Sequence, residues 1–244
     1  MRSYATPEAD VCNRYYAPGE KEIEEYWFVG RQKPNRWWDD PQVRDIFPRY
    51  QAPFIRRAAD EVGYSREAEV GRWGLIPWFS KTADVKYSTN NARSEELSVK
   101  DSYKHPWARG QRCIIPAQWF YEPYWGPYED QFKRCEWWQF RRADGDPWGL
   151  AGIWNAWIDK TTGERHESFS MLTMNADEHP LMKRMHRNEL DAKTKQPLPL
   201  NQQDKRSVIP IELGDVDQWL AGTVEEASRL LKLAPVEVFD AGPV

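Results

Sequence analysis

The sequence has little of several features that mark whole classes of protein. No apolar stretch approaches the twenty or so residues that a membrane-spanning helix needs, so no such span is expected. The first eleven residues include no apolar core of the kind found in secretory signals, so no secretory signal is expected either. The three cysteines, Cys12, Cys113 and Cys135, show no CxxC spacing. A disulfide framework and a zinc ribbon are therefore not expected, and a reducing cytoplasm is the expected compartment.

The sequence also shows no sign of a boundary between domains. The 244 residues contain no internal repeat, no low-complexity tract and no Gly/Ser linker. Hydrophobic residues make up 40% and charged residues 30%, a composition typical of a globular chain. The length fits one large domain or two small ones.

Two residue types are abundant. There are 14 tryptophans, and 21 of the 34 basic residues are arginines. These side chains stack on nucleic-acid bases, and arginine also forms paired hydrogen bonds with phosphates. A tryptophan-rich core with arginines on the surface explains the same numbers, so composition leaves both interpretations open.

The net charge of −4 hides an uneven distribution. Residues 207–244 hold seven acids and two bases. Residues 86–112 hold six bases and three acids, and residues 181–206 hold seven bases and three acids. Because counterion release depends on the phosphates that a protein contacts, a local basic face is enough for nucleic-acid binding. The two basic segments are expected to line one such face.

Apolar patterns and turn signals predict an α+β domain around a mostly antiparallel sheet. Helices are expected at 19–28, at 178–186 and twice near the C-terminus, where Gly222 closes one helix and the capping box of Thr223 and Glu226 opens the next. Residues 31–48 are expected to form a loop. A hairpin is expected around Gly63, with a second strand that reaches residue 76. Two strands, at 149–157 and 167–174, are expected on either side of a turn at 159–163. Single strands are expected at 112–122 and 207–212.

Four polar positions are candidates for chemistry. Cys12 lies near the chain start, residues 90–95 form a polar run, Glu122 ends an apolar strand, and His186 lies in the most basic segment. A carboxylate at the end of an apolar strand is costly unless it is paired or functional. Taken singly, each has an ordinary structural explanation, as a buried thiol or a solvent-facing side chain.

Eight sequence blocks, in one order over residues 11–220, carry a resemblance to a known family. They are VCNRY (11–15), RYQAP (49–53), WGLIP (73–77), NARSE (91–95), RCIIPAQWFYE (112–122), AGIW (151–154), SFSMLTMNA (168–176) and HPLMKRMH (179–186). Together they resemble the SOS-response-associated peptidase family, SRAP, a set of abasic-site sensors that crosslink covalently to single-stranded DNA.

The resemblance implies one domain over residues 12–244, with a distorted, mostly antiparallel, barrel-like sheet and flanking helices, and an N-terminal extension at 1–11. It implies that Cys12 is the nucleophile once it is the N-terminal residue, and that Asn91, Glu122 and His186 complete the catalytic set. The DNA contacts that it implies are Arg14, Pro53 (in a loop that packs against a base) and Arg93, with Thr173 and Arg206 as further phosphate or active-site contacts. The aromatic residues Trp78 and Phe79 are expected to stack on bases.

These residue types suit the implied chemistry. A ring-opened abasic site presents an aldehyde, and an N-terminal cysteine presents an amine and a thiol two carbons apart. The amine condenses to a Schiff base, and the thiol then closes a five-membered thiazolidine. Glu122 is expected to move protons, and His186 to protonate the sugar ring oxygen or to assist reversal. Asn91 is expected to orient the adduct, and the arginines to hold phosphates.

The chain departs from the family pattern at three places. Gln51 replaces the asparagine of the RYNxAP block, and Gln118-Trp119 and Pro123 alter the surroundings of Glu122. Ten residues, the last of them Val11, stand between the initiator and Cys12. Either an over-extended reading frame adds them, with Val11 at a GTG start, or they must be removed before Cys12 can react.

Two alternative functions remain open at this point. Cys12, Glu122 and His186 would also suit a cysteine peptidase that cleaves other proteins, and a chain that keeps residues 1–11 would suit a non-catalytic binder of single-stranded nucleic acid. The expected partner is single-stranded DNA containing abasic sites, with no cofactor, no metal and no membrane, acting as a monomer at damaged DNA in the cytoplasm.

Overall fold

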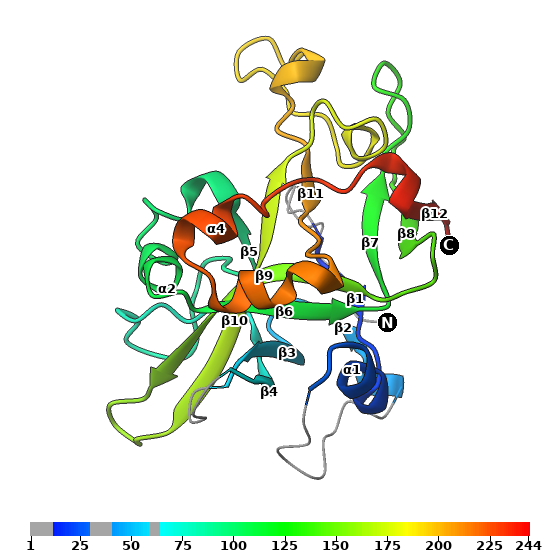
Figure 1. Ribbon diagram of the computed structural model, residues 1–244. Coiled ribbons are helices and arrows are strands. Elements are labelled where there is room, and N and C mark those ends of the chain that lie inside the picture. The colour runs from blue at the N-terminus through cyan, green and yellow to red at the C-terminus, as the bar shows by residue number, and fades with distance from the viewer. Residues whose placement is uncertain (1–11, 30–40, 59–63) are drawn as a thin grey trace.

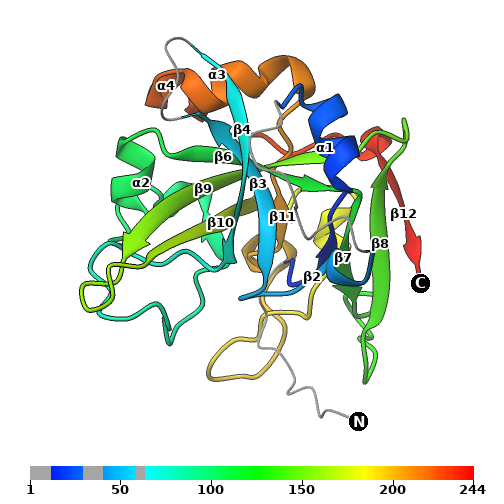
Figure 2. The ribbon, with the colours of Figure 1, turned by 90° about the horizontal axis from the view of Figure 1, so that it is seen from below.

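A closed five-stranded barrel forms the centre of the molecule. The computed structural model describes residues 12–29, 41–58 and 64–244. The barrel pairs its strands in the order β10-β4-β3-β6-β9, and β9 pairs again with β10 to close the ring (Figures 1 and 2). All pairings are antiparallel except β10 with β4, which is parallel. The strands are β3 (Gln51–Arg57), β4 (Arg66–Trp73), β6 (Arg112–Ala117), β9 (Trp148–Ile158) and β10 (Arg165–Asn175).

Two short strands extend the barrel along the C-terminal half of β10. β5 (Asn91–Arg93) pairs parallel to it, with Thr173 opposite Arg93, and β11 (Arg206–Val208) pairs antiparallel, with Thr173 opposite Val208. Segments far apart in the sequence are thereby brought side by side at one end of the barrel.

A second sheet packs beside the barrel and is antiparallel throughout. Its order is β12-β8-β7-β1-β2, from β12 (Phe239–Pro243), β8 (Glu136–Arg142), β7 (Trp119–Tyr124), β1 (Tyr15–Tyr16) and β2 (Asp45–Ile46). The expectation of one strand over 112–122 is wrong, because the run is divided between β6 in the barrel and β7 in this sheet. The break falls at Gln118, whose N–H donates to the carbonyl of Tyr16 at 2.7 Å. Because β7 pairs within the second sheet, Glu122 lies outside the barrel.

Two buried clusters hold these layers together. One includes Phe54, Phe120, Trp148 and Phe169 and lies between the barrel and the second sheet. The other lies between the barrel and the helices α2 (Lys104–Ala108), α3 (Val216–Ala221) and α4 (Val224–Ser228). Both faces of β6 are thus covered, and all six of its residues are buried, which explains its continuous apolar run. Among the described residues six tryptophans are buried, so the core accounts for much of their abundance: Trp27, Trp73, Trp107, Trp148, Trp157 and Trp219.

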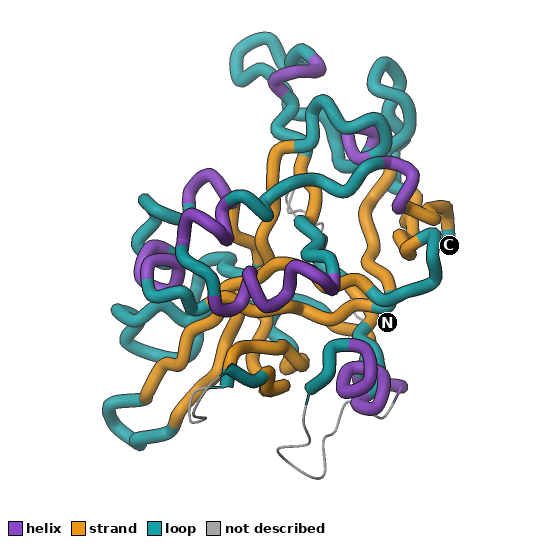
Figure 3. Tube along the Cα trace, viewed as in Figure 1, coloured by secondary structure: helices purple, strands orange, loops and turns teal. Residues whose placement is uncertain are grey.

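The helices are few and short (Figure 3). α1 (Glu20–Tyr26) confirms the helix expected at 19–28, and α3 and α4 confirm the C-terminal pair. Thr223 and Glu226 form the expected capping box at the start of α4. The single-turn 3₁₀ segments are Pro41–Val43, Ser94–Glu96, Met182–Arg184, Leu200–Gln202, Leu213–Asp215 and Val236–Val238. Within the described ranges, no helix has the length and apolar character to cross a membrane.

The helix expected at 178–186 is wrong. Only the 3₁₀ turn Met182–Arg184 forms there, because the ring of His179 accepts the N–H groups of Leu181 at 3.2 Å and Met182 at 3.0 Å. His186 then takes a left-handed backbone conformation. The strand expected at 207–212 is limited to β11, and the predicted loop 31–48 contains β2 in its described part. The expected hairpin is β3 with β4, although Gly63 itself lies outside the described residues.

Candidate active site

Cys12 lies against β7, where the N-terminal segment joins the second sheet. Tyr15 pairs with Phe120, and the carbonyl of Arg14 accepts the N–H of Tyr121 at 3.0 Å. This pairing brings Cys12 level with Glu122 and buries its side chain completely. The backbone of Cys12 has a φ of 34°, a positive value that is uncommon outside glycine and costs energy at other residues.

One carboxylate oxygen joins Cys12 to His186. Glu122 is completely buried on the inner face of β7. Its Oε2 accepts the N–H of Cys12 at 3.1 Å and lies 2.8 Å from Nε2 of His186. The backbone N–H of His186 donates to the carbonyl of Pro123 at 2.7 Å, which fixes the histidine beside the same strand.

The imidazole of His186 and the carboxylate of Glu122 share one hydrogen bond. Nε2 lies 2.8 Å from Oε2, and it would be the donor to an ionised carboxylate, which only accepts. Nδ1 has no hydrogen-bond partner among the described residues, and neither has Oε1 of Glu122. The cluster therefore holds one hydrogen bond between the imidazole and the carboxylate and two further polar atoms that remain available to a reacting group.

Asn91 contacts the same cluster from β5. Its side-chain Nδ2 donates to the carbonyl of Cys12 at 3.3 Å. The neighbouring Asn90 donates to Oδ1 of Asn13 at 3.0 Å, so two successive asparagines hold the chain on either side of the Cys12–Asn13 peptide bond. The structure thus brings together all four predicted catalytic residues, although their roles stay predictions.

The surroundings of Cys12 keep its sulfur protonated. Burial raises the pKa of the Cys12 thiol well above its ordinary value, the charge of Glu122 raises it further, and a hydrogen bond to the backbone of Arg14 opposes both. A thiol of this kind needs a base at the moment of reaction. Among the described residues, no group of three or more His, Cys, Asp or Glu side chains is arranged to hold a metal ion.

Four of the predicted DNA contacts lie at least partly on the surface. Trp78 and Phe79 are 58% and 43% exposed and meet edge to face. Arg93 has an exposed side chain that forms an ion pair with Asp204 at 2.6 Å. Arg14 forms two 2.9 Å hydrogen bonds with Asp45 and lies over the ring of Tyr121. A phosphate would have to compete with these carboxylates for either arginine.

The other three predicted DNA contacts are buried. Pro53 was expected in a loop, which is wrong, because it lies inside β3 and offers no open face to a base. Thr173 is 2% exposed. The side chain of Arg206 is 4% exposed and is bound by Glu95 at 2.5 Å and by Asp204 at 3.2 Å. All three residues thus lie within the fold, and their part in DNA binding stays a prediction; Arg206 links β11 to the segment after β5.

A small hollow opens beside the cluster, with a volume of about 110 Å³. The two basic segments meet here, as expected, but Asp204 and Glu95 neutralise part of their charge. Sequence reasoning missed Lys205 and Asp204, and it did not foresee that Glu95 of the polar run 90–95 pairs with Arg206, because a partner 111 positions away leaves no local signal. The lining residues are Asn91, Arg93, Thr173, His186, Arg187, Glu189, Gln203, Asp204, Lys205 and Arg206.

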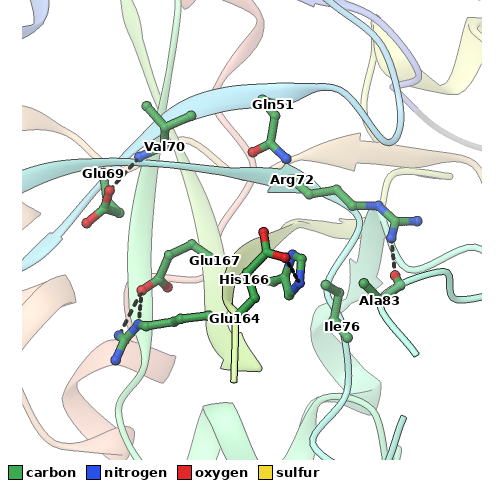
Figure 4. A pocket seen from close by; sticks show the side chains of 10 residues that line it. Gln51, Glu69, Val70, Arg72, Ile76, Ala83, Glu164, His166 and Glu167 are labelled. Atoms are coloured by element: carbon green, nitrogen blue, oxygen red, sulfur yellow. Dashed lines mark hydrogen bonds and ion pairs between the residues drawn. The ribbon is translucent and has the colours of Figure 1, made fainter. Parts of the chain in front are cut away.

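A hollow of larger volume, about 410 Å³, lies elsewhere. Figure 4 shows it between the strand ends of β3, β4 and β10. Its polar groups are engaged with each other: Glu167 accepts from Arg165 at 2.8 Å, Glu164 lies 3.7 Å from His166, and Arg72 donates to the carbonyl of Ala83. None of the predicted site residues lines it, so size alone does not identify the site.

Known proteins resemble this chain over different lengths. The abasic site processing protein HMCES of Gallus gallus is 31% identical over 176 residues, which cover 61% of this chain and 51% of that protein. The abasic site processing protein YoqW of Bacillus subtilis (strain 168) is 31% identical over 115 residues, which cover 47% of this chain and 48% of that protein. The chain thus spans about half the length of these curated relatives.

Solved structures match over almost the full chain. A crystal structure of a protein from Bordetella bronchiseptica aligns with a TM-score of 0.75 at 31% identity, covering 96% of this chain and 99% of that one. A protein from Bacteroides thetaiotaomicron shares the fold, with a TM-score of 0.69 at 21% identity and coverage of 96% and 92%. The model of the SOS response associated peptidase (SRAP) family matches residues 11–244. Since this match includes every element of the barrel and all four clustered residues, the chain belongs to the SOS response associated peptidase family.

Proposed function

We propose that this protein recognises abasic sites in single-stranded DNA and binds them covalently through Cys12 once that residue is N-terminal. The observation that carries the proposal is the shared contact of Glu122, whose Oε2 meets both the backbone nitrogen of Cys12 and the imidazole of His186. The names of the relatives HMCES and YoqW, both abasic site processing proteins, support the same substrate.

The first step exposes the amine. The thiol of Cys12 attacks the carbonyl carbon of Val11, the C–N bond of that amide breaks, and the nitrogen takes a proton. A water molecule then hydrolyses the thioester, which releases the preceding residues with a carboxylate and restores the thiol. Glu122 lies at hydrogen-bond distance from this nitrogen, where a group that delivers the proton has to be.

The crosslink forms in two further steps. The free amine adds to the aldehyde carbon of the ring-opened sugar, and loss of one water gives an imine. The sulfur then adds to the imine carbon, and its proton passes to the nitrogen, which yields a thiazolidine. Since burial keeps the thiol protonated, the carboxylate of Glu122 would receive that proton and return it to nitrogen.

Burial of the thiol favours this reading over cleavage of other proteins. Cys12 is 0% exposed, so any foreign molecule, whether a polypeptide or DNA, reaches its sulfur only after the residues around it move. The peptide bond that precedes Cys12 belongs to the residue itself and needs no access path. The proteolytic activity is therefore proposed to act on the protein's own chain.

The test uses a chain that begins at Cys12 and an oligonucleotide with a single abasic site. A denaturing gel should show a retained DNA–protein band, and the intact mass should equal the sum of both molecules less one water. A Cys12→Ser variant should form no stable band, and neither should an intact oligonucleotide. A band of equal yield and stability with Cys12→Ser would refute the thiazolidine.

A further inference from the structure

A lysine that the proposed chemistry does not use lies behind His186. Lys205 directly precedes β11 and is 3% exposed. Its backbone N–H donates to Oδ1 of Asp177 at 2.7 Å, and its carbonyl accepts the N–H of Ala176 at 2.6 Å. The position of Lys205 is thus tied to the segment that directly follows β10.

The ammonium group of Lys205 donates hydrogen bonds to three consecutive residues, 186–188. Nζ donates to the carbonyl of His186 at 2.9 Å, to the carbonyl of Arg187 at 3.1 Å and to Oδ1 of Asn188 at 3.3 Å. A lysine ammonium has three N–H groups, and all three have a partner here. No donor is left for a phosphate, and the lone pair that a nucleophile needs is absent.

The backbone conformation of His186 is held by hydrogen bonds to other segments. Its φ of 63° is a left-handed conformation that persists at a non-glycine residue only where the surroundings hold it. The backbone N–H is held by the carbonyl of Pro123 and the backbone carbonyl by Lys205. The imidazole between these two contacts is directed at Glu122.

We infer that Lys205 is a positioning residue, whose ammonium group holds the strained turn at 186–188 so that the imidazole of His186 stays on the carboxylate of Glu122. The inference concerns the site of the proposed function and rests on that function only where DNA serves as the readout. It assigns Lys205 to the geometry of His186 and not to DNA binding.

The hydrogen bonds from Lys205 to the turn at 186–188 depend on the protonation state of its amine and therefore on pH. Burial lowers its pKa to about 8, while the charges of Asp177 and Glu189 oppose the change. Below this pH the ammonium supplies three donors; above it the neutral amine supplies two and turns a lone pair toward an oxygen. The turn is therefore held below pH 8 and loosened as the pH rises through it. Other charged or titratable groups of the adjoining hollow are Arg93, His186, Arg187, Asp204 and Arg206.

The experiment compares Lys205→Met with the unchanged chain and with Lys193→Met, an exposed lysine of the same region. The chain has only four histidines, so ¹⁵N-histidine labelling gives a few resolvable imidazole signals. In the unchanged chain and in Lys193→Met, the His186 signal should shift with a midpoint near pH 8. In Lys205→Met this transition should vanish, the His186 signal should move at pH 7, and the other three histidines should keep theirs.

Crosslinking and binding provide the second readout. Lys205→Met should slow crosslinking on the order of tenfold to a hundredfold, because a displaced catalytic group is costly, while the affinity for undamaged single-stranded DNA should stay unchanged. An affinity loss with a salt slope shallower by about one would make Lys205 a phosphate contact and overturn the inference. Unchanged His186 signals with the pH transition intact would overturn it as well. Because the signals of His186 need no DNA, their result stands even if no crosslink forms.

A second variant tests the same inference if Lys205→Met does not fold. Lys205→Arg keeps a positive charge and donors but does not titrate near pH 8. If Lys205→Met fails to fold, Lys205→Arg should still lose the transition of the His186 signal. A transition that persists in Lys205→Arg would assign it to another group and refute the inference.

Discussion

Replacing Glu122 by glutamine tests the central contact of the cluster. Glutamine has nearly the same shape, so the fully buried site keeps its packing. The amide oxygen can still accept from Cys12 and His186, but the side chain carries no charge and takes up no proton. Because general acid–base groups contribute on the order of 10²- to 10⁴-fold to a rate, we expect Glu122→Gln to slow crosslinking by about 10²- to 10³-fold.

The same substitution should affect stability only moderately. Oε1 of Glu122 has no partner among the described residues, so the amide NH₂ placed there would bury two unpaired donors. Such a loss costs about 1–3 kcal/mol, which urea unfolding can measure. Removing a buried carboxylate acts in the opposite direction, because burial of a charged group is itself costly, so the net change should lie at the lower end of this range.

The assay measures single-turnover crosslinking by a chain that begins at Cys12, with samples resolved on a denaturing gel. Glu129→Gln, at an exposed glutamate of the loop after β7, is the matched control and should react like the unchanged chain. A folded Glu122→Gln protein that reacts within about twofold of the control would refute proton transfer by Glu122.

Three further outcomes are expected. A chain that keeps residues 1–11 should not crosslink unless its mass first falls to that of the Cys12-start form, and Cys12→Ala should abolish both events; a stable crosslink on a chain whose mass still includes those residues would contradict the amine mechanism. Arg93→Ala should weaken binding to single-stranded DNA equally for all base sequences and reduce the salt slope by about one, as fluorescence anisotropy across a salt series would reveal; an unchanged affinity would remove Arg93 from the interface. Thr223→Ala should lower the free energy of unfolding by about 1 kcal/mol through loss of the α4 cap, and a change near zero in urea unfolding would show that the cap contributes nothing.

Local signals in the sequence were sufficient where short-range chemistry decides the structure. The capping box at Thr223 and the helix at 19–28 depend on residues three or four positions apart, and both form. The run 112–122 could not be divided correctly, since the change of sheet at Gln118 depends on Tyr16, about a hundred residues earlier. The helix expected at 178–186 failed because the ring of His179 takes N–H groups, a competition that hydrophobic periodicity does not register.

The candidate site, too, could be predicted only in part from the sequence. Family motifs identified Cys12, Asn91, Glu122 and His186, and the structure brings them together. The carboxylates that bind the predicted DNA-contacting arginines were not foreseen: Asp45 lies 31 positions from Arg14, and Glu95 lies 111 positions from Arg206. Ion pairs across such separations follow from the completed fold, so burial and pairing of an arginine cannot be judged from the motif that contains it.

The assembly of the reactive cluster from distant segments has a consequence for the timing of maturation. Cys12 meets partners 79 and 110 positions away, and Glu122 meets one 64 positions further along. During synthesis the nucleophile emerges well before the histidine that completes its surroundings. Contacts of this range require the closure of long loops, which slows folding. If Cys12 is uncovered by its own chemistry, as proposed, a nascent or misfolded chain keeps its amine blocked, and reactivity toward aldehydes appears only in molecules that have already reached the native state.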